Sequence, residues 1–254
     1  MKDQKKYDKR KDRAKLKRKV GNKMAGNKGF NERMAMNALD SINKNYKQLM
    51  SSVPSYQQSS IEVLCNNWQS NKGKENITKL VQQLNGILDS LSQNIGKIFT
   101  FVNQRAELID ADSDGINYKA VPFKPTNEQF DAKNAKNDQE AGNTAQWDLN
   151  ETNKGVDQAR HFLRNRVHKN LDEIESEMYN LEGAFEYSEE GAAVANALHK
   201  LTLTLERFAN KVNKGLDKWE EEYKSDASAH KVNVDELTKG TNGLEMDLNF
   251  DGLK

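Results

Sequence analysis

The chain carries one spacing of apolar residues twice, at an offset of 117 positions and without a gap. The two copies cover residues 39–106 and 156–223. In the second half of each copy the large apolar residues are separated by 4, 3, 4, 3, 4, 4, 3 and 4 positions. They are Ile77, Val81, Leu84, Leu88, Leu91, Ile95, Phe99, Val102 and Ala106 in copy one, and Val194, Leu198, Leu201, Leu205, Phe208, Val212, Leu216, Trp219 and Tyr223 in copy two. Steps of three and four indicate amphipathic helices, so the chain is predicted to hold two copies of one helical unit.

Each copy is predicted to be an antiparallel helical hairpin, over 31–109 and over 156–226. In the first hairpin a polar turn at 69–74 separates two long helices, and Pro54 predicts a kink or split near Ser51–Ser52. A hairpin alone leaves its apolar stripe half covered. The predicted fold class is therefore all-α, with the two hairpins closing as a four-helix bundle, either within one chain or by dimerisation.

The segments outside the hairpins are polar. Residues 1–30 hold thirteen Lys or Arg against three Asp, a local balance of about +10 in a chain of net charge +1, which predicts a flexible basic arm. Residues 110–155 are predicted to be a linker with a short helix near 128–140, and residues 227–254 a flexible tail. Four linker side chains are candidates for docking on the bundle: Val121, Phe123, Phe130 and Trp147.

Composition narrows the classes of protein that fit. Only 35% of the residues are hydrophobic and 30% are charged, which favours long helices with narrow apolar stripes over one large core. No apolar run reaches the roughly 18 residues of a membrane span, and no apolar segment follows the basic N-terminus, so neither a transmembrane helix nor a cleaved signal peptide is predicted. The single cysteine, Cys65, excludes an intramolecular disulfide and is interpreted as a packed side chain.

Catalytic motifs are missing from the sequence. It contains no Glu-x-x-His pair, P-loop, nucleophile elbow or dinucleotide fingerprint, so an enzyme is not expected. His161 and His168 are seven positions apart on one helix face, and they are flanked by Arg160, Arg164 and Arg166. That face is interpreted as a cationic surface stripe rather than a metal site.

The linker opens with a candidate Ca²⁺ loop. Asp110, Asp112 and Asp114 alternate before Gly115, as in the first half of an EF-hand loop, and Ile116 would donate its backbone carbonyl. Val121 stands where the bidentate Glu is expected, which predicts weak binding. Residues 247–252 repeat the opening of the loop. The alternative interpretation is an acidic turn in which glycine ends a helix.

The ends of the hairpins carry a family resemblance. Trp68 and Phe185 end the first helix of each copy, and Gly73 and Gly191 follow them. This arrangement resembles the WXG100 family, whose members are small helical hairpins that pair into four-helix bundles and leave bacteria through type VII secretion. The spacing departs from the family's Trp-x-Gly, because the aromatic and glycine are five and six positions apart.

The resemblance implies a tandem fusion of two WXG100-like units. The family's export signal is Tyr-x-x-x-Asp/Glu after the last helix. Tyr223 stands at the tyrosine position, and Asp226 comes one position early. The resemblance implies a secreted protein without a cleaved signal peptide that meets the secretion machinery as a substrate or as an effector-associated partner or chaperone.

Two other functions fit the residues. One is an intracellular or virion scaffold that uses the 1–30 arm to bind nucleic acid or an acidic partner. The other is a Ca²⁺-responsive adaptor that uses the acidic loop. The sequence leaves open the partner protein and the choice between pairing within one chain and a homodimer.

Overall fold

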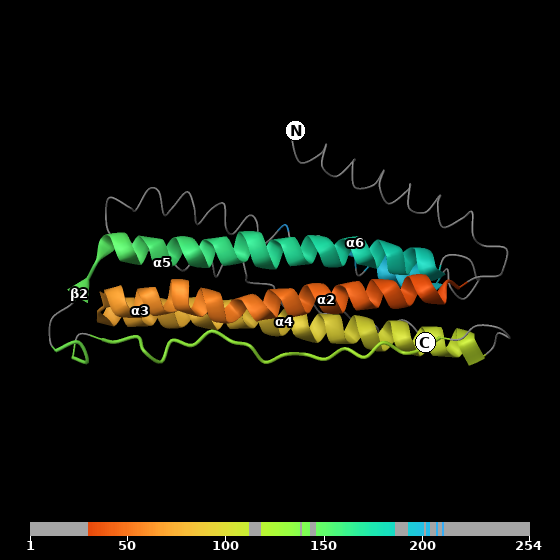
Figure 1. The fold of residues 1–254 in the computed structure, drawn as a ribbon, viewed down its shortest axis with the longest axis horizontal. Helices are drawn as coiled ribbons and strands as arrows, with labels where there is room; N and C mark the ends of the chain where they lie inside the picture. The colour runs from red at the N-terminus through yellow and green to blue at the C-terminus, as the bar shows by residue number, and fades with distance from the viewer. Residues whose placement is uncertain are drawn as a thin grey trace, which may run out of the picture.

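The computed structural model describes residues 30–111, 118–137, 139–142, 146–185, 193–200, 202–203, 207 and 210. Long helices lie side by side in this part of the chain and form an elongated bundle, with an extended segment running along it (Figure 1). The predicted all-α fold class is confirmed.

The first long helix consists of α2 (Glu32–Tyr56), the π-helix η1 (Gln57–Glu62) and α3 (Val63–Asn67). Asn31 caps its start, because its side chain accepts the Met34 backbone N–H at 3.0 Å. Of the two predicted effects of Pro54, the split near Ser51–Ser52 is wrong, since the backbone stays α-helical through Tyr56. The irregularity follows Pro54 as a π segment, in which wider hydrogen-bonded turns replace a sharp break.

The second and third long helices follow two very short strands. Strand β1 (Trp68–Gln69) precedes α4 (Asn71–Ala111), and β2 (Gln146–Trp147) precedes the third long helix. The two strands pair antiparallel, with Trp68 opposite Trp147. The third long helix consists of α5 (Leu149–Phe162), the π-helix η2 (Leu163–Val167) and α6 (His168–Phe185). A further helical segment covers 193–200.

The linker is shorter than predicted, because the third long helix begins at Leu149 rather than near 156. Asp148 caps it by accepting the Glu151 backbone N–H at 3.1 Å. This cap lies 117 positions after Asn31, so the repeat extends to the helix start. The prediction failed because the first turns of α5 are polar, and Thr152 rather than a large apolar residue is buried there.

The first and third long helices pack antiparallel within the one chain. At one end of the pair the Asn31 N–H donates to the Ala184 carbonyl at 2.9 Å, and near the other the Asp148 N–H donates to the Asn67 carbonyl at 2.9 Å. Between them Ser60 Oγ donates to the Gly155 carbonyl at 2.7 Å. This close approach requires a small residue at Gly155, where an added Cβ would lie 2.8 Å from Leu64 Cγ and 3.1 Å from the Ser60 carbonyl oxygen.

Residues 118–137, here called the strap, run back along the bundle in an extended conformation (Figure 1). The Phe123 ring lies 5.1 Å from that of Tyr46 and 5.3 Å from that of Phe99. Phe130 is buried with its ring 5.1 Å from Phe162. Docking of Val121, Phe123 and Phe130 is thus confirmed, whereas the Trp147 side chain lies outside the described structure.

Amide side chains hold the strap by its backbone. Asn103 bonds both the N–H and the carbonyl of Val121, at 3.1 and 2.9 Å. Asn85 does the same for Phe130, at 2.8 and 2.9 Å. Gln57, the first residue of η1, bonds both groups of Asp131 at 3.0 Å. The strap therefore lies between the first long helix and α4.

The strap replaces the short helix predicted near 128–140. Backbone groups that bond to Asn85 and Gln57 are no longer available for helical hydrogen bonds, and among the described residues of this range only short turns occur, at 133–134 and 139–142. The predicted boundary of the basic arm at residue 30 is wrong by one residue. Phe30 packs on the bundle, with its ring 4.8 Å from that of Phe185 and 5.9 Å from that of Tyr118.

Candidate functional site

The first hairpin-end motif forms a tight structural turn. Trp68 is buried, with 6% of its surface exposed, directly after the end of α3. The Gly73 N–H donates to Ser70 Oγ at 2.9 Å in the first turn of α4. A Cβ on Gly73 would lie 2.3 Å from the Trp68 carbonyl oxygen and 2.9 Å from its indole ring. The turn thus requires glycine at this position, beneath the tryptophan.

The second motif residue lies at the other end of the bundle. Phe185 is fully buried and ends α6 against Phe30. Because the first and third long helices are antiparallel, their C-terminal aromatics are separated by the length of the bundle. Gly191 lies outside the described residues, so its place in a turn stays a prediction.

Several predicted site residues lie in segments that the structure does not describe. Asp112, Asp114 and Ile116 of the acidic loop are among them, as are Tyr223 and Asp226. Asp110 lies in the last turn of α4, where only its backbone is described. Among the described residues there is no group of three or more His, Cys, Asp or Glu placed to hold a metal ion. The Ca²⁺ prediction therefore stays a prediction.

The two histidines of the third long helix have separate surroundings. His161 is exposed, and its Nδ1 lies 2.6 Å from the Tyr56 hydroxyl of the first long helix. His168 Nε2 lies 3.9 Å from an Asp172 carboxylate oxygen in the next turn. His161 thus contacts the facing helix, whereas His168 lies near a carboxylate of its own helix.

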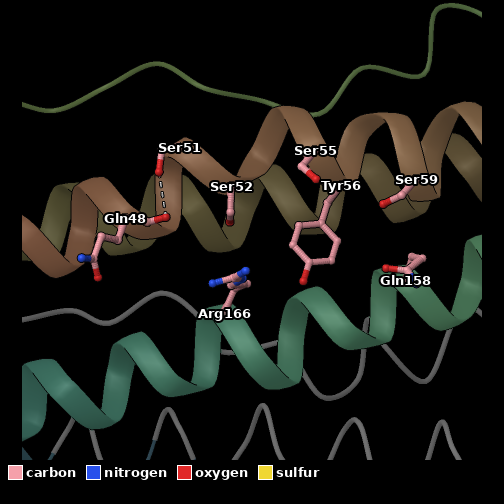
Figure 2. A pocket seen from close by; sticks show the side chains of 8 residues that line it. All are labelled: Gln48, Ser51, Ser52, Ser55, Tyr56, Ser59, Gln158 and Arg166. Carbon is pink, nitrogen blue, oxygen red and sulfur yellow. Dashed lines mark hydrogen bonds between the residues drawn. The ribbon is translucent and has the colours of Figure 1, made fainter.

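A polar pocket of about 600 Å³ lies between the first and third long helices. One wall is hydroxyl-rich and comes from the first long helix, and the other carries an arginine from the third (Figure 2). The lining residues are Gln48, Ser51, Ser52, Ser55, Tyr56, Ser59, Gln158 and Arg166. A smaller hollow adjoins it, shares Gln48 and Ser51, and is also lined by Asp40, Asn43, Lys44 and Lys47.

Sequence reasoning missed this pocket. Its signal was the series Ser51, Ser52, Ser55 and Ser59, whose steps of three and four from Ser51 and Ser52 to Ser55 and on to Ser59 place hydroxyls on one helix face. The facing residues Gln158 and Arg166 come from a helix about 100 positions away in the chain. No spacing in the sequence joins the two walls, since the antiparallel pairing of the helices brings them together.

Cys65 has the environment of a packed side chain. It is buried, with 1% of its surface exposed. Burial, aided by the negative charges of Glu62 and Asp131, raises the pKa of its thiol to about 11. The thiolate, which is the nucleophilic form, is therefore disfavoured at neutral pH.

Comparisons with known proteins assign no family, since no family model, curated protein or solved structure matches this chain. Within the described part of the chain, no helix combines the length and apolar character needed to cross a membrane. The site residues are therefore interpreted from their own geometry.

Proposed function

We propose that this chain is a non-enzymatic helical-bundle protein exported by type VII secretion, as a substrate or as the partner of an effector. The observation that carries the proposal is the antiparallel packing, within one chain, of the first and third long helices, which begin the two predicted hairpins. A fused pair of WXG100-like units would close in this way.

The Trp68 turn supports the same proposal. The family resemblance rests on an aromatic at the end of the first helix followed by a glycine in the turn. Here Gly73 has no room for a Cβ beside Trp68, so the pair forms one constrained unit although five positions separate them.

Export is tested in the native host with and without its type VII secretion ATPase, by comparing the protein in the medium with that in the cytosol. The proposal expects ATPase-dependent appearance in the medium and loss of export in Tyr223→Ala. Lysis is monitored with a cytosolic marker. Retention of the protein in the cytosol in both strains would overturn the proposal.

A second candidate function follows from the charge of residues 1–30, about +10. An internal scaffold would use this arm on nucleic acid, and its affinity would fall steeply with salt because counterions are released from the phosphates. Removal of residues 1–29, which leaves Phe30 in place, should abolish that salt dependence. DNA binding that is unchanged by the truncation would exclude this function of the arm.

A further inference from the structure

The polar pocket between the first and third long helices is not explained by export or by the basic arm. We propose that it binds the phosphate ester of a small polyol, such as glycerol phosphate, free or as a lipid headgroup. The inference is independent of the proposed function.

The charge of the lining favours an anion. Arg166 is the ionised residue that lines the pocket, and no carboxylate shares the lining. Arg166 is exposed and makes no ion pair or hydrogen bond with the residues that the structure describes. The neighbouring carboxylate of Asp157 is 3.1 Å from Arg160 and so is already paired. A guanidinium group binds phosphate through charge-assisted hydrogen bonds, and one group often donates two parallel bonds to the same phosphate.

Neutral polar groups complete the lining, some as acceptors and some as donors. Ser51 and Ser52 donate to the Gln48 and Leu49 carbonyls of their own helix, at 3.0 and 2.6 Å, so their oxygens are left to accept. Ser55 and Ser59 have no hydrogen-bond partner within the described structure, so their hydroxyls can donate to a ligand. The amides of Gln48 and Gln158 can both donate and accept. A phosphate with adjacent hydroxyl groups matches this mixture.

Figure 2 shows how the groups converge. The Arg166 side chain rises from the third long helix towards Ser52, and the Tyr56 hydroxyl points from the first long helix towards the third. Gln158 lies beyond Tyr56, on the side of Ser59. The phosphate is assigned to the Arg166 end of the pocket, and the polyol hydroxyls to the Ser55, Ser59 and Gln158 end.

The backbone around the pocket supports a built site. Arg166 belongs to η2, and Ser59 belongs to η1, so both walls include a π segment. Such segments are rare and occur frequently at functional sites. The volume of about 600 Å³ lies within the range of small-molecule sites and exceeds what a bare phosphate fills.

The test uses the full chain with three probes: inorganic phosphate, glycerol 3-phosphate, and phosphatidylcholine vesicles with and without phosphatidylglycerol. Binding of the soluble probes is followed by ¹H–¹⁵N NMR and calorimetry, and vesicle binding by co-flotation. We expect glycerol 3-phosphate to bind more tightly than inorganic phosphate and to shift the resonances of Ser55, Ser59 and the Arg166 side chain.

The decisive variant is Arg166→Gln, and Arg164→Gln is its matched control. Arg164 is another exposed arginine of η2, and it does not line the pocket. We expect Arg166→Gln to weaken binding about tenfold or more, since it removes a charged donor. Arg164→Gln should stay close to wild type. Ser55→Ala/Ser59→Ala should bring the affinity for glycerol 3-phosphate down towards that for inorganic phosphate.

Each outcome has one meaning. Arg166-dependent binding of soluble glycerol 3-phosphate supports a free ligand, and Arg166-dependent binding of phosphatidylglycerol vesicles alone supports a lipid headgroup. Equal weakening by Arg164→Gln and Arg166→Gln would reduce the site to a general cationic surface and overturn the inference. Equal affinities for the two soluble phosphates would overturn the polyol assignment. If none of the probes binds, the proposed phosphate site itself is overturned.

Discussion

Glycines of this bundle differ in how closely their surroundings are packed. A Cβ on Gly155 of α5 would lie 2.8 Å from Leu64 Cγ and 3.1 Å from the Ser60 carbonyl oxygen. A Cβ on Gly86 of α4 would meet nothing within 4 Å. The two glycines are both helical, so the same substitution has opposite consequences at the two positions.

Gly155→Ala should destabilise the protein by roughly 1–3 kcal/mol, because the added methyl forces the first and third long helices apart. Gly86→Ala should stabilise it by about 0.5–1 kcal/mol through helix propensity alone. Urea denaturation of both variants measures the two effects. A neutral or stabilising Gly155→Ala would show that the helices are less tightly packed than described.

Gly73→Ala tests the hairpin-end motif. The added Cβ would overlap the backbone carbonyl of Trp68, which cannot rotate away as a flexible side chain would. The first turn of α4 must shift, and we expect a loss of about 2 kcal/mol or more together with a change in tryptophan fluorescence. Gly86→Ala serves again as the control. Unchanged fluorescence and stability would show that the turn does not need glycine.

The strap binds along α4 because the distance between two asparagines of the helix matches the distance between their partners in the strap. Asn85 and Asn103 are 18 positions apart on α4, a rise of about 27 Å and five full turns, so both amides lie on one face. Their partners Phe130 and Val121 are nine positions apart in the strap, about 28–30 Å of extended chain. Each amide therefore meets a backbone N–H and carbonyl in register.

Asn85→Ala should destabilise the protein by roughly 1–3 kcal/mol, because it leaves the N–H and carbonyl of buried Phe130 without partners. Asn76→Ala is the matched control, an asparagine of the same helix whose side chain has no hydrogen bond in the described structure. Hydrogen exchange at the Phe130 amide should accelerate in Asn85→Ala alone. Equal exchange in both variants would contradict the role of the amide pair.

The sequence predicts these elements unevenly. The apolar spacing of α4 continues over many turns, and such a signal gives both the helix and its face. The strap has no such signal, because its backbone is satisfied by side chains from 45 and 18 positions away. Asp148 marked a helix start, but the apolar stripe that usually confirms a start begins only at Val156.

At the scale of the whole molecule, helix pairing and the strap together enclose Cys65. The thiol is buried, and Glu62 of the same helix and Asp131 of the strap raise its pKa further. A raised pKa means that the folded thiol keeps its proton where the unfolded thiol loses it. The unfolded state then binds fewer protons, so stability falls as the pH rises from about 9 towards 11.

Wild type should therefore lose stability relative to Cys65→Ala over this pH window, by at most about 1.4 kcal/mol per pH unit. Other titrating groups cancel in the difference between the two proteins. Urea denaturation at several pH values measures it, and a thiol reagent should react slowly with the native protein and completely with the unfolded one. A difference that does not depend on pH would mean that the thiol is solvated.

The sequence by itself determined the helical fold class, the repeat of 117 positions and the packing of Cys65, because these follow from the spacing of apolar residues along the helices. Tertiary structure alone decided that the first and third long helices pack antiparallel in one chain, that the strap lies between the first long helix and α4, and that Arg166 faces a row of serines. These features join residues far apart in the chain. Their energies come from close approach and from satisfying buried backbone groups, which no periodicity records.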